Sequence, residues 1–230
     1  MRRPHAIWLA FSVLVLSCAA CRLPALSRQT ASGELLVDDF SSATSGWEQG
    51  EYDTGAVGYR DGAYFVSSTG GGNPMWGVAF TSFSDVTVSV DTTQISAPDN
   101  DNNAYGVVCR EQGDGSGYYL MISGDGGFAI FLATEDGFEP LVDWTLTDVV
   151  LQGNAKNHIE ATCSGPILEL VVNGTRLGTA EDTTFTKGDV ALTVTSYERD
   201  QPSEVLFDNL VITRPTRRQP TGDLTHYWAQ

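Results

Sequence analysis

Between residues 34 and 213, apolar and polar residues alternate with a period of two in most short segments, as in strands with one buried face. Turn sequences such as Asp61-Gly62 and Asn173-Gly174 separate these segments and favour tight hairpins. The predicted strands cover residues 34–40, 57–60, 63–67, 76–81, 85–95, 104–111, 117–123, 127–133, 140–144, 157–163, 167–172, 189–195 and 204–213. Residues 145–152 (TLTDVVLQ) fit a short helix, a loop or a strand. About a dozen short strands predict an all-β domain, either a sandwich or a barrel.

The same alternation predicts which side chains share a face of a strand. Cys163 lies on the apolar side of its strand and Glu160 on the other side, and Glu169 lies on the polar side of the following strand. Cys109 likewise lies opposite Arg110. If both cysteines face the core, then Arg110, Glu160 and Glu169 project from an outer sheet face. Two interpretations remain open there: a solvated, salt-bridged surface, or the lining of a shallow ligand groove.

The first 21 residues (MRRPHAIWLAFSVLVLSCAAC) combine a basic start, an apolar stretch over residues 7–16 and a small-residue exit that ends at Cys18. This pattern is typical of a secretory signal with a lipobox, and it is too short for an ordinary membrane-spanning helix. We therefore predict a signal peptide over residues 1–17 and lipidation of Cys18. The chain would then be extracytoplasmic, anchored to the bacterial cell membrane through its lipid only.

Two alternatives to this reading of the leader stay open. Cys21 is a rival lipidation site, although the third residue before it is Cys18 rather than an aliphatic residue. Plain secretion after an A-x-A-like site is the other. Residues 18–33 are small and polar and fit a lipidated tether, residues 34–213 one domain, and residues 214–230 a flexible tail.

Charge excludes one class of partner. The chain has a formal net charge of −16, with 13 basic and 29 acidic side chains. Residues 1–30 hold four of the arginines and no acidic residue, which leaves 9 basic against 29 acidic side chains, or −20, for the rest. Such a surface repels nucleic-acid phosphates, so we expect no nucleic-acid partner.

Only two cysteines, Cys109 and Cys163, follow the leader. In an exported protein an isolated pair predicts one disulfide. A redox or zinc role is disfavoured, because the sequence has no C-x-x-C motif and its three histidines are scattered.

Calcium is the one cofactor for which the sequence offers ligands. The segment PDNDNN (residues 98–103) concentrates hard oxygen donors, among them Asp99, Asp101 and Asn103. It fails as an EF-hand loop, since Ala104 replaces the required glycine and Arg110 stands at the position of the bidentate glutamate. A calcium site of another kind and a plain Asx-rich turn both remain possible interpretations.

Aromatic side chains supply candidate ligand contacts, because flat rings stack on the apolar faces of sugars. Trp76, Trp144 and Tyr118 are our candidates, together with the polar side chains Arg110, Glu160 and Glu169. Trp47 follows an opening Ser-Gly turn, and we expect it to be structural.

Several segments in this order resemble one known group of proteins. They are LLVDDFSSATSGW, GYRDGAYFV, LELVVNGTRLG and the closing FDNLVI. The chain resembles the concanavalin A-like lectin/glucanase jelly rolls over roughly residues 34–213, particularly the laminin-G-like and 3-keto-disaccharide-hydrolase-like domains of bacterial surface lipoproteins. The resemblance implies a two-sheet antiparallel β-sandwich, with the segment around Asp38 and Phe40 near the strand that carries Phe207 and Asn209.

The resemblance to glucanases implies a strand with an E-x-D-x-E carboxylate pattern, and this sequence has none. Adjacent acids such as Glu135-Asp136 would face opposite ways in a strand, and no G-x-S-x-G motif is present. We therefore expect a non-catalytic module that binds carbohydrate or another surface ligand. The alternatives are a glycoside-acting hydrolase of the 3-keto-disaccharide-hydrolase-like type and a structural subunit that binds an envelope protein.

Overall fold

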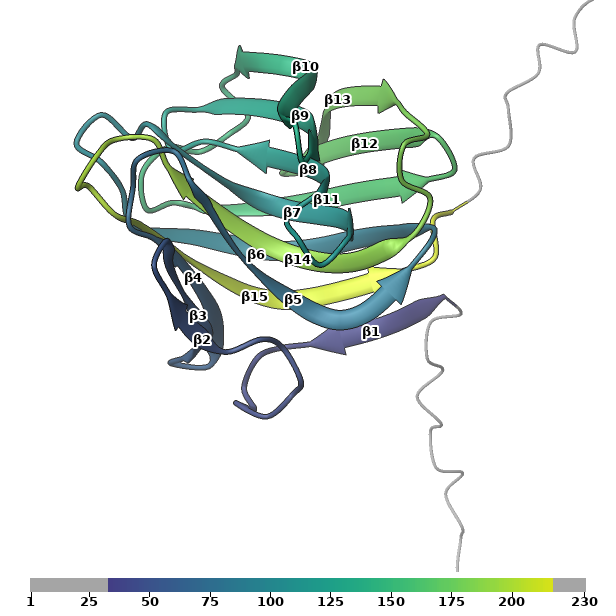
Figure 1. Cartoon of the computed structure of the whole chain (residues 1–230), viewed down its shortest axis with the longest axis horizontal. Helices are drawn as coiled ribbons and strands as arrows, with labels where there is room; N and C mark the ends of the chain where they lie inside the picture. Colours follow the sequence, from purple (N-terminus) through teal and green to yellow (C-terminus); the bar gives the residue numbers. More distant parts are fainter. Residues whose placement is uncertain (1–32, 217–230) are drawn as a thin grey trace, which may run out of the picture. The chain divides into compact units, whose positions relative to one another are not determined.

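The computed structural model describes residues 33–216, which form two antiparallel β-sheets packed face to face (Figure 1). The nine-stranded sheet has the order β13 (Thr175–Glu181), β12 (Ile167–Val172), β11 (Lys156–Ser164), β6 (Val86–Ser96), β15 (Ser203–Thr213), β4 (Ala63–Ser68), β3 (Gly55–Arg60) and β2 (Gly50–Tyr52), and β1 (Glu34–Asp38) also pairs with β15. The six-stranded sheet has the order β10 (Gly137–Leu146), β9 (Gly127–Thr134), β8 (Gly117–Ile122), β7 (Asn103–Glu111), β14 (Gly188–Ser196) and β5 (Pro74–Phe83). The predicted all-β, two-sheet antiparallel sandwich is confirmed.

Alternate side chains of both sheets fill the space between them, as the period of two requires. In β11, Ile159 and Ala161 face this core, and in β12 Leu168 and Leu170 do so, all fully buried. Trp47 is also buried, and its expected structural role is confirmed: it packs against the neighbouring aromatic rings at centroid distances of 5.3 and 5.5 Å.

The sequence pattern did not predict two of the strands. β2 has only three residues, and β13 has a mixed pattern in which most side chains are exposed, so neither shows a clear apolar alternation. The ambiguous segment 145–152 is not a helix: its first two residues end β10, and bends follow.

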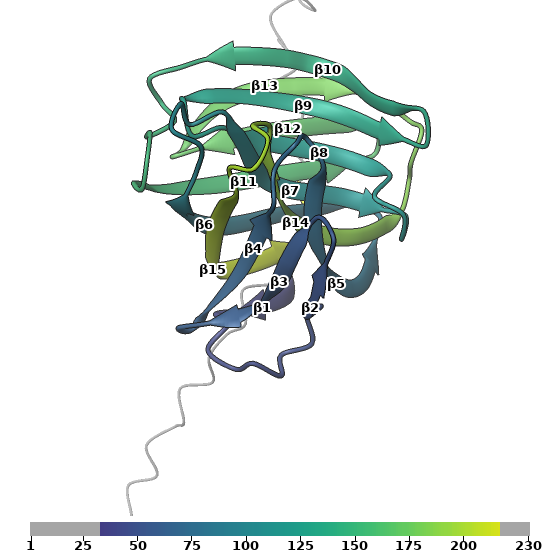
Figure 2. The same cartoon turned by 60° about the vertical axis from the view of Figure 1, so that its left-hand side comes forward.

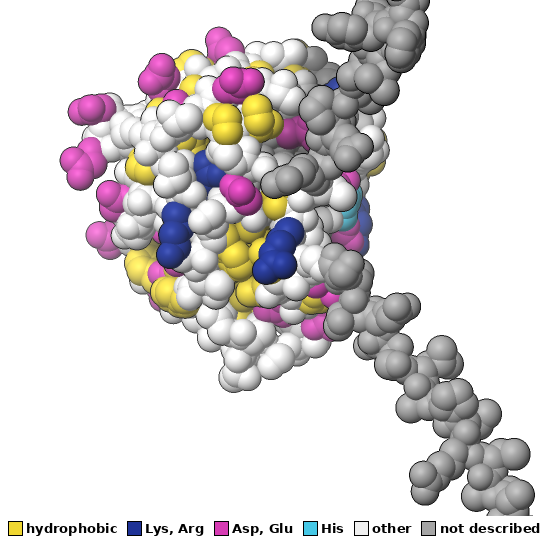
Figure 3. Space-filling model, turned by 90° about the vertical axis from the view of Figure 1, so that its right-hand side faces the viewer, with side chains coloured by type: hydrophobic (Ala, Val, Ile, Leu, Met, Phe, Trp, Pro, Cys, Tyr) yellow, Lys and Arg dark blue, Asp and Glu magenta, His cyan; other side chains and the backbone are white. Residues whose placement is uncertain are grey.

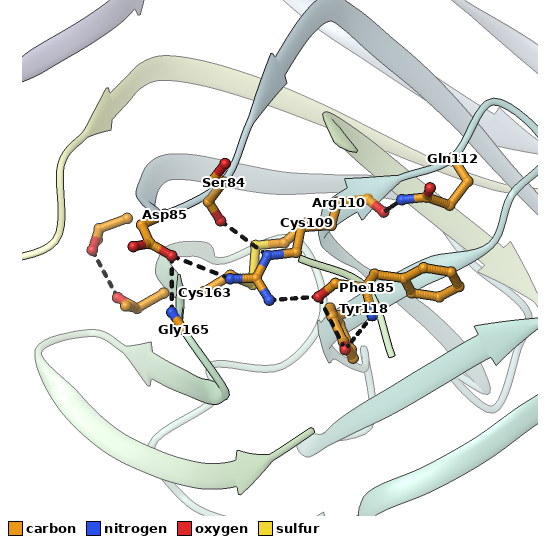
Figure 4. Close-up of a disulfide and its surroundings, with 11 residues drawn as sticks. Ser84, Asp85, Cys109, Arg110, Gln112, Tyr118, Cys163, Gly165 and Phe185 are labelled. Atoms are coloured by element: carbon orange, nitrogen blue, oxygen red, sulfur yellow. Dashed lines mark hydrogen bonds and ion pairs between the residues drawn. A yellow bond between two sulfur atoms is a disulfide. The ribbon is translucent and has the colours of Figure 1, made fainter. Parts of the chain in front are cut away.

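The predicted disulfide between Cys109 and Cys163 is present and joins the two sheets (Figure 4). Cys109 lies on β7 of the six-stranded sheet and Cys163 on β11 of the nine-stranded sheet. Both side chains are fully buried, and their Cα atoms are 6.5 Å apart. The bond therefore ties the two layers together inside the core, near one end of both strands.

The expectation that Arg110 projects from an outer sheet face is wrong. Arg110 has a φ of 56°, and the register between β7 and β14 shifts beside it, so that alternation is interrupted at this residue. Its side chain is 2 % exposed, and its guanidinium donates hydrogen bonds to the carbonyls of Ser84 (2.9 Å) and Phe185 (2.7 Å) and to Asp85 (3.3 Å), as Figure 4 shows. Through these hydrogen bonds, Arg110 links β7 to the segment of Ser84 and Asp85 and to that of Phe185.

The first and last strands are neighbours. β1 pairs with β15, with Asp38 opposite Leu210, which confirms the expected proximity of the opening segment to the closing strand. The predicted signal peptide, Cys18, Cys21 and nearly all of the predicted tether and tail lie outside the described residues. Among residues 33–216 no helix has the length and apolar character needed to cross a membrane.

Candidate functional site

The outward face of the six-stranded sheet is apolar, which is unusual for a sheet surface turned away from the core. A second cluster of buried side chains covers it, comprising Val78, Ala104, Val108, Tyr119, Met121, Ala133 and Ala191, with Trp76 and Phe131 packed against them. A solvated antiparallel sheet alternates apolar and polar residues, but β7 and β8 are buried at every position. Continuous apolar runs such as YYLMI are a sequence signal from which this covered face could have been predicted.

Strand β10 carries aromatic rings onto this face. It lies at the edge of the sheet beside β9 (Figure 2), and its register shifts twice along that pairing. The ring of Phe138 stands over Tyr119 at 4.9 Å, and the rings of Phe138 and Trp144 lie 6.2 and 5.9 Å from that of Phe131. The two shifts interrupt the regular pairing of β10 with β9 and change the direction of the β10 side chains. As a result, the rings of Phe138 and Trp144 both lie on this face.

These rings border two cavities that share Trp144 and Tyr197, which we call together the Trp144 groove. The larger, of about 290 Å³, is lined by Gly72, Pro74, Met121, Phe131, Phe138, Asp143, Trp144, Thr195 and Tyr197. The smaller, of about 120 Å³, is lined by Asn102, Asn103, Ser123, Asp125, Gly127, Trp144, Thr145, Leu146 and Tyr197. The groove therefore has an aromatic part and a polar end, and Phe138, Trp144 and Tyr197 are 49 %, 36 % and 37 % exposed.

The polar end includes part of the predicted calcium loop. Asn103 is buried, donates to Oε1 of Gln94 (2.9 Å) and accepts the amide of Gly124 (2.8 Å). Asp101 accepts a hydrogen bond from Nε2 of Gln94 (2.9 Å), whereas Asp99 is exposed. These protein hydrogen bonds fit the Asx-rich turn, and the described residues contain no group of three or more His, Cys, Asp or Glu side chains that could hold a metal ion.

A third cavity, of about 340 Å³, lies beside the edge strand β5, and we call it the Trp76 pocket. It is lined by Glu48, Tyr52, Thr54, Met75, Trp76, Val78, Phe80, Glu111, Gly113 and Asp189. Gly115 lies so close to the ring of Trp76 that a Cβ there would come within 2.9 Å of it, and its φ is 87°. The loop after β7 thus packs tightly on Trp76.

The structure does not bring the six predicted ligand contacts into one site. Trp76 and Trp144 lie on the outward face of the six-stranded sheet, in different cavities. Glu160 and Glu169 lie on the outward face of the other sheet, where Glu169 forms an ion pair with Arg176 (3.2 Å), and neither lines any of the three cavities.

Tyr118 faces inward and is fully buried. Its hydroxyl donates to Asp182 (2.6 Å) and accepts the amide of Phe185 (3.0 Å). Burial and the bond to Asp182 raise the pKa of Tyr118 to about 12, so the hydroxyl stays protonated at neutral pH. Tyr118 therefore belongs to the structural network around Arg110 and not to an exposed face.

Neither the protein-family models nor the curated proteins contain a match to this chain. Solved structures do match. The carbohydrate-binding module CBM66 from Bacillus subtilis is 19 % identical with a TM-score of 0.51, over 74 % of this chain and 96 % of that one. A Bacillus subtilis protein of unknown function with a galectin-like fold is 12 % identical with a TM-score of 0.59, over 80 % and 97 %. The β-glucanase of Bacillus licheniformis is 12 % identical with a TM-score of 0.57, over 82 % and 100 %. The sandwich is thus a concanavalin A-like jelly roll.

Proposed function

We propose that this chain is a non-catalytic, extracytoplasmic module that binds carbohydrate in the Trp144 groove. The observation that carries the proposal is the half-exposed ring of Trp144, which borders an aromatic cavity on one side and an amide-rich cavity on the other. Rings of this kind bury apolar faces of a ligand, while a few fixed polar groups orient it. The carbohydrate-binding module with the same fold supports this class of ligand.

The groove is built on a rigid support. Met121 of β8 belongs to the buried cluster, and Phe131 of β9 packs against that cluster. Asn103 is held by hydrogen bonds at both ends of its amide. A site whose side chains are already fixed loses little conformational entropy on binding, which favours a useful affinity.

Charge in the groove favours neutral sugars. Its lining includes two carboxylates, Asp125 and Asp143, and neither lysine nor arginine. Acidic side chains are also scattered over the face of the molecule in Figure 3, with a few Lys and Arg among them. A uronate or sulfated glycan would be repelled, and a neutral glycan would not.

The sequence has no E-x-D-x-E carboxylate pattern, which supports a non-catalytic role, and the two carboxylates of the groove take part in local hydrogen bonds. Asp125 accepts one from the hydroxyl of Ser123, and Asp143 accepts one from the amide of Trp144 (2.8 Å). The lipoprotein-like leader supports a location outside the cytoplasm, with Cys18 as the anchor.

The test is binding of the purified protein to an array of neutral and acidic oligosaccharides, followed by calorimetry on any neutral sugar that binds. We expect Trp144→Ala to weaken that binding by about thirtyfold, since loss of a central aromatic contact costs about 2 kcal/mol. Its melting temperature should stay close to that of the original chain, because the ring is 36 % exposed.

Glu160→Gln, on the opposite sheet, is the matched control and should bind like the original chain. Unchanged affinity of the Trp144 variant would contradict the location of the site. Release of new reducing ends from the bound sugar would contradict the non-catalytic role and favour a hydrolase. Absence of any glycan binding would direct the search to an envelope-protein partner.

A further inference from the structure

The Trp76 pocket lies where the six-stranded sheet departs from regular pairing on both sides of Asp189. Against β5, Asp189 pairs with Ser82 but Ala191 pairs with Val78, and the interrupted segment holds Phe80 at a φ of 50°. Against β7, the register shifts between Asp189 and the next residue, beside the left-handed Arg110. Bulges of this kind redirect side chains and are common next to functional sites.

The bulge at Arg110 brings two carboxylates together on the outward face. It places Glu111 directly opposite Asp189, and both line the pocket. Glu111 is only 3 % exposed, and its Oε1 accepts the amides of Gly113 and Gly115, both at 2.8 Å. No hydrogen bond within residues 33–216 reaches its Oε2 or the side chain of Asp189. Oε2 of Glu111 and the whole carboxylate of Asp189 are therefore left for a ligand.

No cationic side chain of the described chain forms an ion pair with these carboxylates. The guanidinium of the adjacent Arg110 forms its ion pair with Asp85 instead. Glu48 adds a third acid to the lining. Burial raises the pKa of both Glu111 and Asp189, and the neighbouring carboxylates of Asp189 and Asp114 add to the rise at Glu111. A positively charged ligand would supply the counter-charge that Glu111 and Asp189 lack within the described residues.

Aromatic rings complete the lining. Trp76, Tyr52 and Phe80 border the cavity, and the Tyr52 hydroxyl donates to Oε1 of Glu48 at 2.5 Å, which fixes that ring. Rings and carboxylates together are the chemistry that recognises organic ammonium groups, through cation–π attraction and charge. A bare metal ion prefers a shell of oxygen ligands and gains nothing from the rings.

We propose that the Trp76 pocket is a second binding site, separate from the Trp144 groove, which takes the ammonium group of an organic cation against Glu111, Asp189 and the ring of Trp76. Two sources share this chemistry: the free amine of an amino sugar and the trimethylammonium group of choline. The site does not depend on the Trp144 groove, so either site can exist without the other.

The experiment is calorimetry of the full chain with three probes: the free-amine disaccharide of glucosamine, its N-acetylated form and choline. We expect at least one ammonium probe to bind and the uncharged acetylated sugar to bind at least tenfold more weakly at this site. Asp189→Asn and Glu111→Gln should each weaken ammonium binding about tenfold, as expected when one charge is removed from a partly buried pair. Gln at position 111 keeps an oxygen acceptor for the two glycine amides.

Asp143→Asn, which removes one carboxylate from the Trp144 groove, is the control and should leave ammonium binding unchanged, as should Trp144→Ala. Phe80→Ala offers a variant that is safe for folding, because this ring is 65 % exposed, and it should weaken binding of choline. Failure of both ammonium probes to bind, or equal binding by the Asp189 and Asp143 variants, would overturn the proposal. Preference for the amino sugar or for choline would identify the source.

Discussion

Removal of the Cys109–Cys163 disulfide is expected to lower the free energy of unfolding by about 4 kcal/mol. The bond closes a loop with a sequence separation of 54 residues, and its loss restores the conformational entropy of that loop to the unfolded chain. The measurement is urea unfolding of the Cys109→Ser/Cys163→Ser double variant beside the original chain.

A reducing agent provides the control for this prediction. It should lower the urea midpoint of the original chain to that of the double variant and leave the double variant unchanged. Equal midpoints for the oxidised original chain and the double variant would show that the inter-sheet bond does not contribute to stability.

Arg110→Met is expected to cost about 3 kcal/mol of the free energy of unfolding. Methionine fills a similar volume but removes the charged donor from the carbonyls of Ser84 and Phe185, and a hydrogen bond from a charged group contributes about 1.5–3 kcal/mol; both bonds are only partly buried, so the loss stays near the lower end of their sum. Asp85 is 54 % exposed in its side chain, so water can solvate it and it adds little to the cost.

Arg176→Met is the matched control for this substitution. Arg176 also pairs with a carboxylate, that of Glu169, but its side chain is 54 % exposed, and exposed ion pairs contribute no more than about 1 kcal/mol. Thermal unfolding of both variants compares the two arginines directly. Similar losses of stability would mean that burial of Arg110 is not what makes it important.

The fold was accessible from the sequence because its strands are short and regular and their turns are marked by Gly, Asn and Asp. Alternation placed Cys109 and Cys163 on the apolar side of their strands, and the structure buries both and joins them in the predicted disulfide. The same reasoning failed one residue later, at Arg110. A non-glycine residue with a φ of 56° leaves no mark in an apolar pattern, yet it reverses the face of Glu111, the one residue that follows it in the strand.

Only some residues of the candidate sites could be predicted from the sequence. Trp76 and Trp144 were selected as candidate ligand contacts, and each lines a cavity. Their neighbours were missed for two reasons. Tyr197 follows β14 and is far from Trp144 in the sequence, and Phe138 shares β10 with Trp144, where two register shifts interrupt the alternation. Glu111 and Asp189 are 78 positions apart, so no spacing motif could reveal a pair that long-range strand register creates.

The pairing of β1 with β15 has a consequence for how this domain can be combined with others. Gly33 and Arg214 are linked by a backbone hydrogen bond of 2.9 Å, so the polypeptide enters and leaves the sandwich at one point. A domain with adjoining ends can be inserted into a surface loop of another protein without stretching its host. The closeness of the two ends also permits circular permutation. A short linker between residues 33 and 214, with new ends at the Asn173-Gly174 hairpin, would preserve both sheets.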